Sequence, residues 1–157
     1  MKRKAKVGRT MEIVYRKALA EDLAAVFELL RQLWPHQPLH LAETGSVYSR
    51  CLSSDSNHMI CAEDGTGRVV GFGSLVVKNS FWQQSFVGYV TTLVVDEASR
   101  GRGIGKGLLD ELTAVAAREG CRRIELDSGF HREQAHLFYE HLQFEKRALL
   151  FSKRIEP

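Results

Sequence analysis

The chain has 157 residues, of which 44% are hydrophobic and 26% are charged, and its net charge is +3 at pH 7. This length and balance predict an ordinary soluble globular protein with one core. They exclude a membrane-spanning protein, because no apolar run approaches the roughly 20 residues that a span requires. The N-terminus also lacks the apolar stretch of a signal peptide.

The positive charge is concentrated in the first ten residues. That segment holds five basic residues and no acid, so the rest of the chain has 17 Lys and Arg against 19 Asp and Glu, a net charge of about −2. We expect residues 1–10 to form a disordered basic tail and residues 11–157 to form a single domain. A tail of this kind could contact nucleic acid, but solvated disorder is the favoured interpretation, and no nucleic-acid partner is expected.

The spacing of the cysteines and histidines shows no pattern typical of a disulfide framework or a metal site. The three cysteines, Cys51, Cys61 and Cys121, are odd in number and show no C-x-x-C spacing. They are typical of reduced thiols in a cytoplasmic chain. The histidine pair His136 and His141 is five residues apart, so the two side chains point to different helix faces. We expect no metal site.

Hydrophobic periodicity predicts alternating strands and helices along the chain. Strands are expected over residues 12–19, 57–63, 69–77, 86–95, 122–127 and 145–155. Helices are expected over residues 21–34, 41–52 and 134–142, with a further helix that begins near Ile104 and stops at Gly120. Pro35 and Pro38 end the first helix, and Gly71 and Gly73 suggest a bulge in their strand.

The strand over residues 86–95 is apolar at both alternating sets of positions. Such a strand is central and is covered on both faces. The order of elements therefore predicts the α/β class, with a mixed central sheet that is flanked by helices on both faces.

A glycine-rich loop with three cations joins this strand to the next helix. It reads Arg100-Gly101-Arg102-Gly103-Ile104-Gly105-Lys106. Glycines allow the backbone to turn and to approach a ligand closely. The first amides of the helix have no partners within it, and the helix dipole makes that end positive. The segment therefore predicts a site for phosphate oxygens.

Two common phosphate-binding patterns do not fit this loop. A Walker loop fails because Arg100 stands at its first glycine and Gly107 stands at its Ser or Thr. The dinucleotide pattern G-x-G-x-x-G fails because its third glycine would fall on Lys106 or Leu108. The remaining pattern, R-x-x-G-x-G over residues 100–105, resembles the acetyl-coenzyme-A pyrophosphate loop of the GCN5-related N-acetyltransferase (GNAT) superfamily.

A second motif lies one strand downstream of the loop. Residues 135–144 read A-H-L-F-Y-E-H-L-Q-F and resemble the A-x-x-F-Y-E-x-x-G-F motif of the same superfamily. The chain departs from the motif at Gln143, where a glycine is usual, and at Arg132, where an asparagine is frequent. The sequence around Arg132 resembles that of aminoalkylphosphonate N-acetyltransferases, whereas residues 30–36 resemble the corresponding segment of aminoglycoside 6′-N-acetyltransferases. The acceptor therefore stays open.

The resemblance implies the GNAT acyl-CoA N-acyltransferase fold for residues 11–157 and acetyl-CoA as the cosubstrate. The backbone of the loop would hold the pyrophosphate; its predicted binding residues are Arg100, Gly101, Arg102, Gly103, Ile104, Gly105 and Lys106. The strand before the loop would pair with the pantetheine amides through the backbone of Leu93, Val94 and Val95. An N–H there would polarise the acyl oxygen.

Tyr139 is the predicted general acid, on the motif match. A phenol titrates near pH 10, so at neutral pH it still carries a proton for the departing thiolate. The alternative is a packed tyrosine with a structural hydrogen bond.

The sequence offers several candidates for the general base. Many relatives carry a glutamate on the central strand, but Thr91 and Thr92 stand there and neither accepts a proton at neutral pH. Asp127 is the predicted base, because it follows a strand at the sheet end where ligands bind in open α/β sheets. Glu125, His131 and His36 are the alternatives, and an acceptor with a low amine pKa would need no dedicated base.

Trp34, His36 and Trp82 are the predicted acceptor-binding residues. We expect direct transfer of an acetyl group from acetyl-CoA to a primary amine of a small molecule. A protein or peptide N-acetyltransferase is the alternative enzyme. A catalytically silent acyl-CoA-binding module is the alternative from another class, which the missing strand glutamate supports and Tyr139 opposes. A homodimer stays open.

Overall fold

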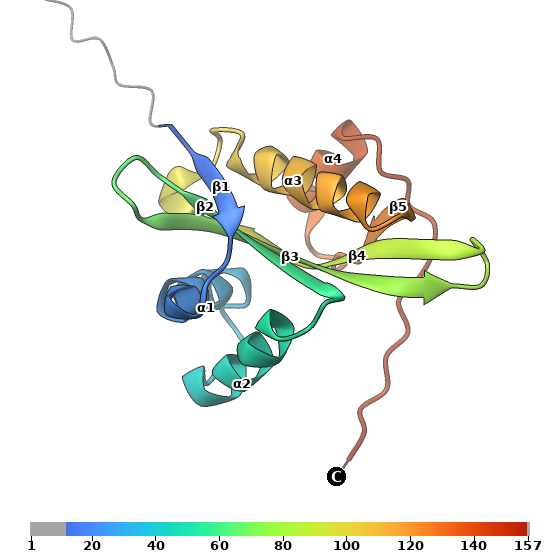
Figure 1. The fold of residues 1–157 in the computed structure, drawn as a ribbon, viewed down its shortest axis with the longest axis horizontal. Coiled ribbons are helices and arrows are strands. Elements are labelled where there is room, and N and C mark those ends of the chain that lie inside the picture. Colours follow the sequence, from blue (N-terminus) through green and yellow to red (C-terminus); the bar gives the residue numbers. More distant parts are fainter. Residues whose placement is uncertain (1–11, 157) are drawn as a thin grey trace, which may run out of the picture. The chain divides into compact units, whose positions relative to one another are not determined.

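The computed structural model describes residues 12–156 of the chain (Figure 1). The expected basic tail over residues 1–10 lies outside the described residues. The chain divides into two compact units, with the boundary between Glu125 and Leu126. In the described part, no helix is long and apolar enough to cross a membrane.

The first unit is built on one sheet with the strand order β1-β2-β3-β4-β5. These strands are β1 Val14–Lys17, β2 Asn57–Glu63, β3 Val69–Ser80, β4 Ser85–Val95 and β5 Cys121–Leu126. The pairs β1–β2, β2–β3 and β3–β4 are antiparallel. A connection through a helix joins β4 to β5, as expected for the predicted mixed sheet.

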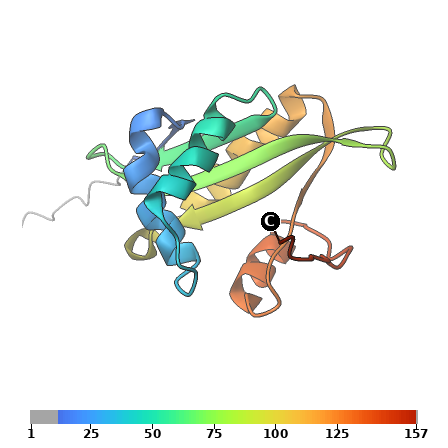
Figure 2. The ribbon, with the colours of Figure 1, turned by 90° about the horizontal axis from the view of Figure 1, so that it is seen from below.

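Helices cover both faces of this sheet, as the sequence predicted. The helical elements of the unit are η1 Ala20–Asp22, α1 Leu23–Leu33, α2 Leu41–Leu52, η2 Glu97–Ser99 and α3 Ile104–Arg118. Figure 2 shows α1 and α2 on one face and α3 on the other. The α1 and α2 side carries a buried cluster that includes Val26, Leu29, Tyr48, Cys61 and Phe72.

Close packing of α3 on β3 explains two glycines that the sequence analysis associated with a bulge. A Cβ at Gly71 would lie 3.0 Å from Leu108 Cδ1, and a Cβ at Gly73 would lie 3.0 Å from Leu112 Cδ1. Both leucines are fully buried. The glycines therefore allow the helix to approach the sheet.

The predicted bulge in this strand is present beside Gly71, because Ala62 pairs with Gly71 and Glu63 pairs with Val69 across the β2–β3 ladder. A second bulge, in the β3–β4 ladder, lies at Thr91. Ser74 pairs with Thr92 and Leu75 pairs with Val90, which leaves Thr91 without an opposite residue. A bulge of this kind bends its strand and increases the local twist. It lies two residues before Leu93, where the backbone of β4 was predicted to pair with the pantetheine amides.

The second unit contains α4 Glu133–His141 and no strand of its own among residues 127–156. The predicted strand over residues 145–155 is therefore wrong. The segment has apolar residues at strand-like spacing, but no other strand in the described part pairs with it, and an unpaired strand is not stable. Its large apolar side chains are exposed, namely Leu149, Leu150, Phe151 and Ile155.

Candidate active site

The glycine-rich loop turns through two left-handed residues. Gly101 has a φ of 76° and Gly103, the N-cap of α3, has a φ of 78°. A Cβ at either position would meet nothing within 4 Å. Glycine is therefore required by the backbone conformation and not by crowding, and the space in front of both residues is open.

The loop presents a run of backbone N–H groups that lack partners. Within residues 12–156, no hydrogen bond uses the amides of residues 101–106, and the first bonded amide is that of Gly107, which donates to Gly103 O at 3.0 Å. These amides lie at the positive end of a 15-residue helix. The arrangement fits a diphosphate, because unpaired amides and the helix dipole both favour an anion there.

The three cations of the loop have different surroundings. Arg100 Nε donates to Val95 O at 3.1 Å, which joins the loop to the end of β4. Lys106 Nζ pairs with Asp110 Oδ2 at 2.5 Å on the exposed surface of α3. Arg102 is exposed and makes no ion pair with the described residues. The side chain that is free to meet a phosphate is therefore that of Arg102.

Near the loop, some backbone N–H and C=O groups of β4 face away from β3. Asp96 N donates to Val70 O at 2.8 Å, so this is a hydrogen-bonded pair of the antiparallel ladder. The bonded pairs alternate with non-bonded ones, and Val95 and Leu93 belong to the non-bonded pairs. Their N–H and C=O groups face away from β3, and the Val95 carbonyl accepts the bond from Arg100. This orientation is the one that an added extended ligand requires.

A buried carboxylate directly follows β4. Asp96 is 8% exposed and accepts hydrogen bonds from Gln32 Nε2 at 3.0 Å, Arg68 Nη2 at 2.6 Å and Ser99 Oγ at 3.4 Å. The bond from Gln32 and the positive charge of Arg68 hold the pKa of this carboxyl below its usual value. Sequence reasoning missed this group, because no local spacing relates Asp96 to Gln32 or Arg68.

The bulge residue Thr91 is hydrogen-bonded within the sheet. Its Oγ1 lies 2.6 Å from Ser74 Oγ, and either hydroxyl could be the donor. Thr91 is exposed, whereas Ser74 is buried. Two adjacent hydroxyls can order a water molecule, but neither can take a proton from an ammonium group at neutral pH.

Tyr139 lies on α4 in the second unit, in an aromatic environment. Its ring packs edge-on against Phe138 at 5.3 Å between centroids and tilted against Phe144 at 5.7 Å. Burial raises the pKa of Tyr139, the charge of Asp127 raises it further, and Arg132 opposes this change. The phenol therefore keeps its proton at neutral pH, as a general acid must.

The turn after α4 takes the conformation that the motif's usual glycine would favour. Gln143 has a φ of 67°, in the left-handed region. Its N–H donates to Glu140 O at 2.9 Å, and Phe144 N donates to Tyr139 O at 2.9 Å. The departure from the motif at Gln143 is therefore accommodated by a strained residue and not by a different turn.

The candidate bases have different environments. Asp127 and His131 are exposed in the irregular segment between β5 and α4. Glu125 accepts a hydrogen bond from Gln83 Nε2 at 3.2 Å. His36 is exposed in the loop between α1 and α2.

Two of the three predicted acceptor residues lie close together. Trp34 caps the C-terminus of α1 and is half-buried, and His36 follows it in the same turn. Trp82 is 72% exposed in the turn between β3 and β4. Figure 2 shows this turn at the far end of the hairpin from α1, so the structure does not group Trp82 with the other two.

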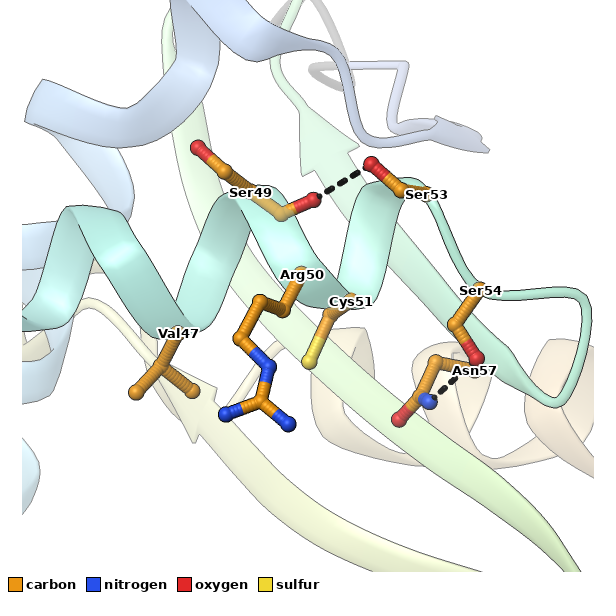
Figure 3. Close-up of a pocket in the computed structure, with 7 residues that line it drawn as sticks. All are labelled: Val47, Ser49, Arg50, Cys51, Ser53, Ser54 and Asn57. Atoms are coloured by element: carbon orange, nitrogen blue, oxygen red, sulfur yellow. Dashed lines mark hydrogen bonds between the residues drawn. The ribbon is translucent and has the colours of Figure 1, made fainter.

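A separate surface hollow runs along the C-terminal half of α2 (Figure 3). It is lined by Val47, Ser49, Arg50, Cys51, Ser53, Ser54 and Asn57. Asn57 Nδ2 donates to Ser54 Oγ at 2.9 Å at one end of it. None of the predicted site residues contributes to this hollow.

A five-stranded sheet in which a glycine-rich loop with unpaired amides directly follows β4 is the arrangement expected of a coenzyme-dependent transferase. The chain belongs to the Acetyltransferase (GNAT) family, whose match covers residues 19–144. It is therefore an N-acetyltransferase of a family that uses acetyl-CoA. The fold class and the family predicted from the two motifs are confirmed.

Named relatives indicate which branch of the family the chain resembles. It is 32% identical over 124 residues to a glucosamine 6-phosphate N-acetyltransferase of Trypanosoma brucei brucei, covering 78% of this chain and 82% of the relative. It is 29% identical over 147 residues to an aminoglycoside N(6′)-acetyltransferase of Stenotrophomonas maltophilia, covering 90% and 94%. An aminoglycoside N-acetyltransferase solved in complex with CoA shares the fold, with a TM-score of 0.82 at 22% identity over 95% of this chain and 99% of that one.

Proposed function

We propose that the chain transfers the acetyl group of acetyl-CoA directly to the primary amine of a small amino sugar, with residues 11–157 acting as one N-acetyltransferase domain. The observation that carries this proposal is the run of unpaired amides over residues 101–106 in front of α3. The acceptor class is supported by the two named relatives, which act on glucosamine 6-phosphate and on aminoglycosides. Both names indicate an acceptor that is an amino sugar or contains one.

The diphosphate of the coenzyme is assigned to the loop. The amides of residues 101–106 would donate hydrogen bonds to its oxygens, and Arg102 would add a positive charge. Arg100 has a different role here, because its bond to the Val95 carbonyl fixes the loop to β4. Lys106 is paired with Asp110, and this exposed ion pair is weak enough to exchange for a phosphate contact.

The extended pantetheine arm is assigned to the backbone of Leu93, Val94 and Val95. Support comes from the ladder geometry, since the N–H and C=O groups of Leu93 and Val95 point away from β3. An N–H in this segment would donate to the acyl oxygen as negative charge develops on it. The acetyl-CoA thioester supplies the activated acyl group.

The transfer forms one C–N bond and breaks one C–S bond. The neutral amine attacks the acyl carbon, and the sulfur leaves as a thiolate that takes the proton of Tyr139. The nitrogen becomes positively charged on attack, and the proton that it then loses restores the Tyr139 phenol. The raised pKa of Tyr139 supports this assignment, because the phenol stays protonated in the resting enzyme. Asp127 is assigned to take the proton that the ammonium group loses, directly or through water, and its exposed position allows either route.

The assay that tests the function is release of free thiol from acetyl-CoA against a panel of amines. The panel contains glucosamine 6-phosphate, aminoglycosides, polyamines, aminophosphonates, amino acids and basic peptides. The proposal expects the highest kcat/KM with an amino sugar. A basic peptide as the best acceptor would indicate a protein N-acetyltransferase, and CoA binding without turnover on any amine would indicate a silent binding module.

The assignment of Asp127 has its own test in the pH profile of kcat/KM. Asp127→Asn should flatten the acidic limb of this profile, because the variant cannot take up a proton. Glu133→Gln, a change of similar size at the exposed start of α4, serves as the control. Survival of the acidic limb in Asp127→Asn would assign the base to another group.

The three cysteines support the predicted cytoplasmic location. Cys51, Cys61 and Cys121 are all free thiols. Burial raises the pKa of Cys61 to about 12, so this thiol is unreactive. A chain that keeps three thiols and no disulfide suits a reducing compartment.

A further inference from the structure

Tyr15 of β1 contacts the first turn of α3, immediately behind the glycine-rich loop. Its hydroxyl donates to the carbonyl of Ile104 at 3.5 Å, although the two residues are 89 positions apart in the chain. Tyr15 is half-buried. β1 therefore contacts the N-terminus of α3, directly after the residues that present the loop amides.

The Tyr15 side chain occupies the place that a side chain at position 107 would need. A Cβ built on Gly107 would overlap the Tyr15 hydroxyl and would also collide with its ring carbons. Gly107 is not among the glycines with a positive φ, so its backbone conformation does not require glycine. A glycine inside a helix is about 1 kcal/mol less favourable than alanine, and the contact with Tyr15 explains why glycine stands here.

The groups around Tyr15 keep its hydroxyl neutral. Burial raises the pKa of Tyr15, and the charges of Asp110 and Glu111 raise it further, while Lys106 acts in the opposite direction. All three charged residues belong to the N-terminal half of α3 or border it, between Lys106 and Glu111. Tyr15 is therefore a hydrogen-bond donor to the helix across the working pH range.

We propose that Tyr15 is a positioning residue for the coenzyme: its ring, seated against Gly107, fixes the first turn of α3 and so directs the amides of residues 101–106. This inference rests on the proposed function, in which those amides hold the diphosphate. In this role Tyr15 acts through α3 and not through a contact of its own with the coenzyme. Binding at a helix N-terminus depends on the direction of each N–H, and a displacement of about 1 Å can reduce activity by about 100-fold.

The test is a double-mutant cycle that measures binding of coenzyme A by calorimetry. Gly107→Ala forces the Tyr15 ring away and should weaken binding by about 10-fold or more. Tyr15→Val keeps a strand-forming residue in β1 but frees the space. In the Tyr15→Val background, Gly107→Ala should change the dissociation constant by less than about 2-fold, because the collision is gone.

Gly45→Ala is the matched control. Gly45 is also a helical glycine, in α2, and its Cβ would meet only Leu23 Cδ2 at 3.2 Å. This variant should bind coenzyme A like the wild type. Steady-state kinetics adds a second measurement: Gly107→Ala should raise the KM for acetyl-CoA and leave the KM for the amine unchanged, a split that a general loss of stability would not produce.

Two results would overturn the inference. One is wild-type affinity of Gly107→Ala for coenzyme A. The other is an equal loss of affinity on adding Gly107→Ala to the wild type and to Tyr15→Val, which would show an effect of the helix that is independent of Tyr15. Failure of the proposed function gives a different result, since the wild-type chain itself would then bind no coenzyme A.

Discussion

Gln32 of α1 makes two hydrogen bonds to adjacent residues at the end of β4. Its Nε2 donates to Asp96 Oδ1 at 3.0 Å, and its Oε1 accepts from Glu97 N at 2.9 Å. Asp96 in turn receives a bond from Arg68. A single side-chain amide thus fixes the point where β4 ends and the segment leading to the glycine-rich loop begins.

Replacing Gln32 with alanine should destabilise the fold by about 1–3 kcal/mol, because the buried Asp96 carboxylate and the Glu97 amide both lose a partner. The measurement is the free energy of unfolding in denaturant. Arg31→Ala is the control on the same helix, since Arg31 makes only an exposed ion pair with Glu28. That change should stay within about 0.5 kcal/mol. Equal effects of the two variants would contradict a structural role for the Gln32 amide.

Reversing the charge of Arg102 should raise the KM for acetyl-CoA much more than the KM for the amine. The reason is that Arg102 is the loop cation without an ion pair in the described residues, so its charge is available to the diphosphate. Arg118→Glu, in the last turn of α3, makes the same change in net charge away from the loop. An Arg102→Glu enzyme with an unchanged KM for acetyl-CoA would remove the diphosphate from this site.

Replacing Tyr139 with phenylalanine should lower kcat by about 10²- to 10⁴-fold, because the thiolate loses its proton donor. Since the pKa of Tyr139 is raised by burial, the phenol stays protonated through neutral pH, and the alkaline limb that it causes should begin above about pH 10. Tyr89→Phe is the matched control: Tyr89 is also half-buried, and its ring packs under Lys78 Nζ. Near-normal turnover of Tyr139→Phe between pH 6 and 9 would assign the acid to another group.

Local patterns predicted much of the fold, because each depends on residues that are neighbours in the chain. The bounds of α2 and β2 agree with the predicted ranges 41–52 and 57–63. The glycine loop was identified from its own spacing, and the structure gives it left-handed glycines and unpaired amides. The segment 145–155 shows the limit of this reasoning, since strand-like spacing does not supply a partner strand.

The contacts that shape the site join residues far apart in the sequence, and no local spacing could predict them. Gln32 and Asp96 are 64 positions apart, and Tyr15 and Ile104 are 89 apart. The loop cations are a further example: they look alike in the sequence, and their different roles depend on the Val95 carbonyl and the Asp110 carboxylate. Only the folded structure shows that Arg102, unlike Arg100 and Lys106, contacts neither of these groups.

A buried ion pair near the start of the chain should govern stability in acid. Asp22 is 6% exposed and is held by Arg16 Nη1 at 2.7 Å, by Arg16 Nη2 at 2.9 Å and by Leu19 N at 2.7 Å. Arg16 Nε also bonds Glu63 Oε2 at 2.7 Å, so the guanidinium links β1 to β2. Asp22→Asn should cost about 1–3 kcal/mol of folding stability at pH 7, because it removes one of the two carboxylates that bind the partly buried Arg16 guanidinium and weakens charge-assisted hydrogen bonds.

The pH dependence follows from the sign of the shift at Asp22. The hydrogen bonds from Arg16 hold the pKa of this carboxyl below its ordinary value in the folded state. Its contribution is therefore fully present above the unfolded pKa of about 3.9 and is lost as the pH falls through the lower, folded pKa. Unfolding free energies measured from pH 7 down to pH 3 should show the wild type approaching Asp22→Asn only below about pH 4. A constant difference between the two proteins down to pH 3 is compatible only with a folded pKa well below 3, whereas convergence already near pH 6 would show that another group controls stability in acid.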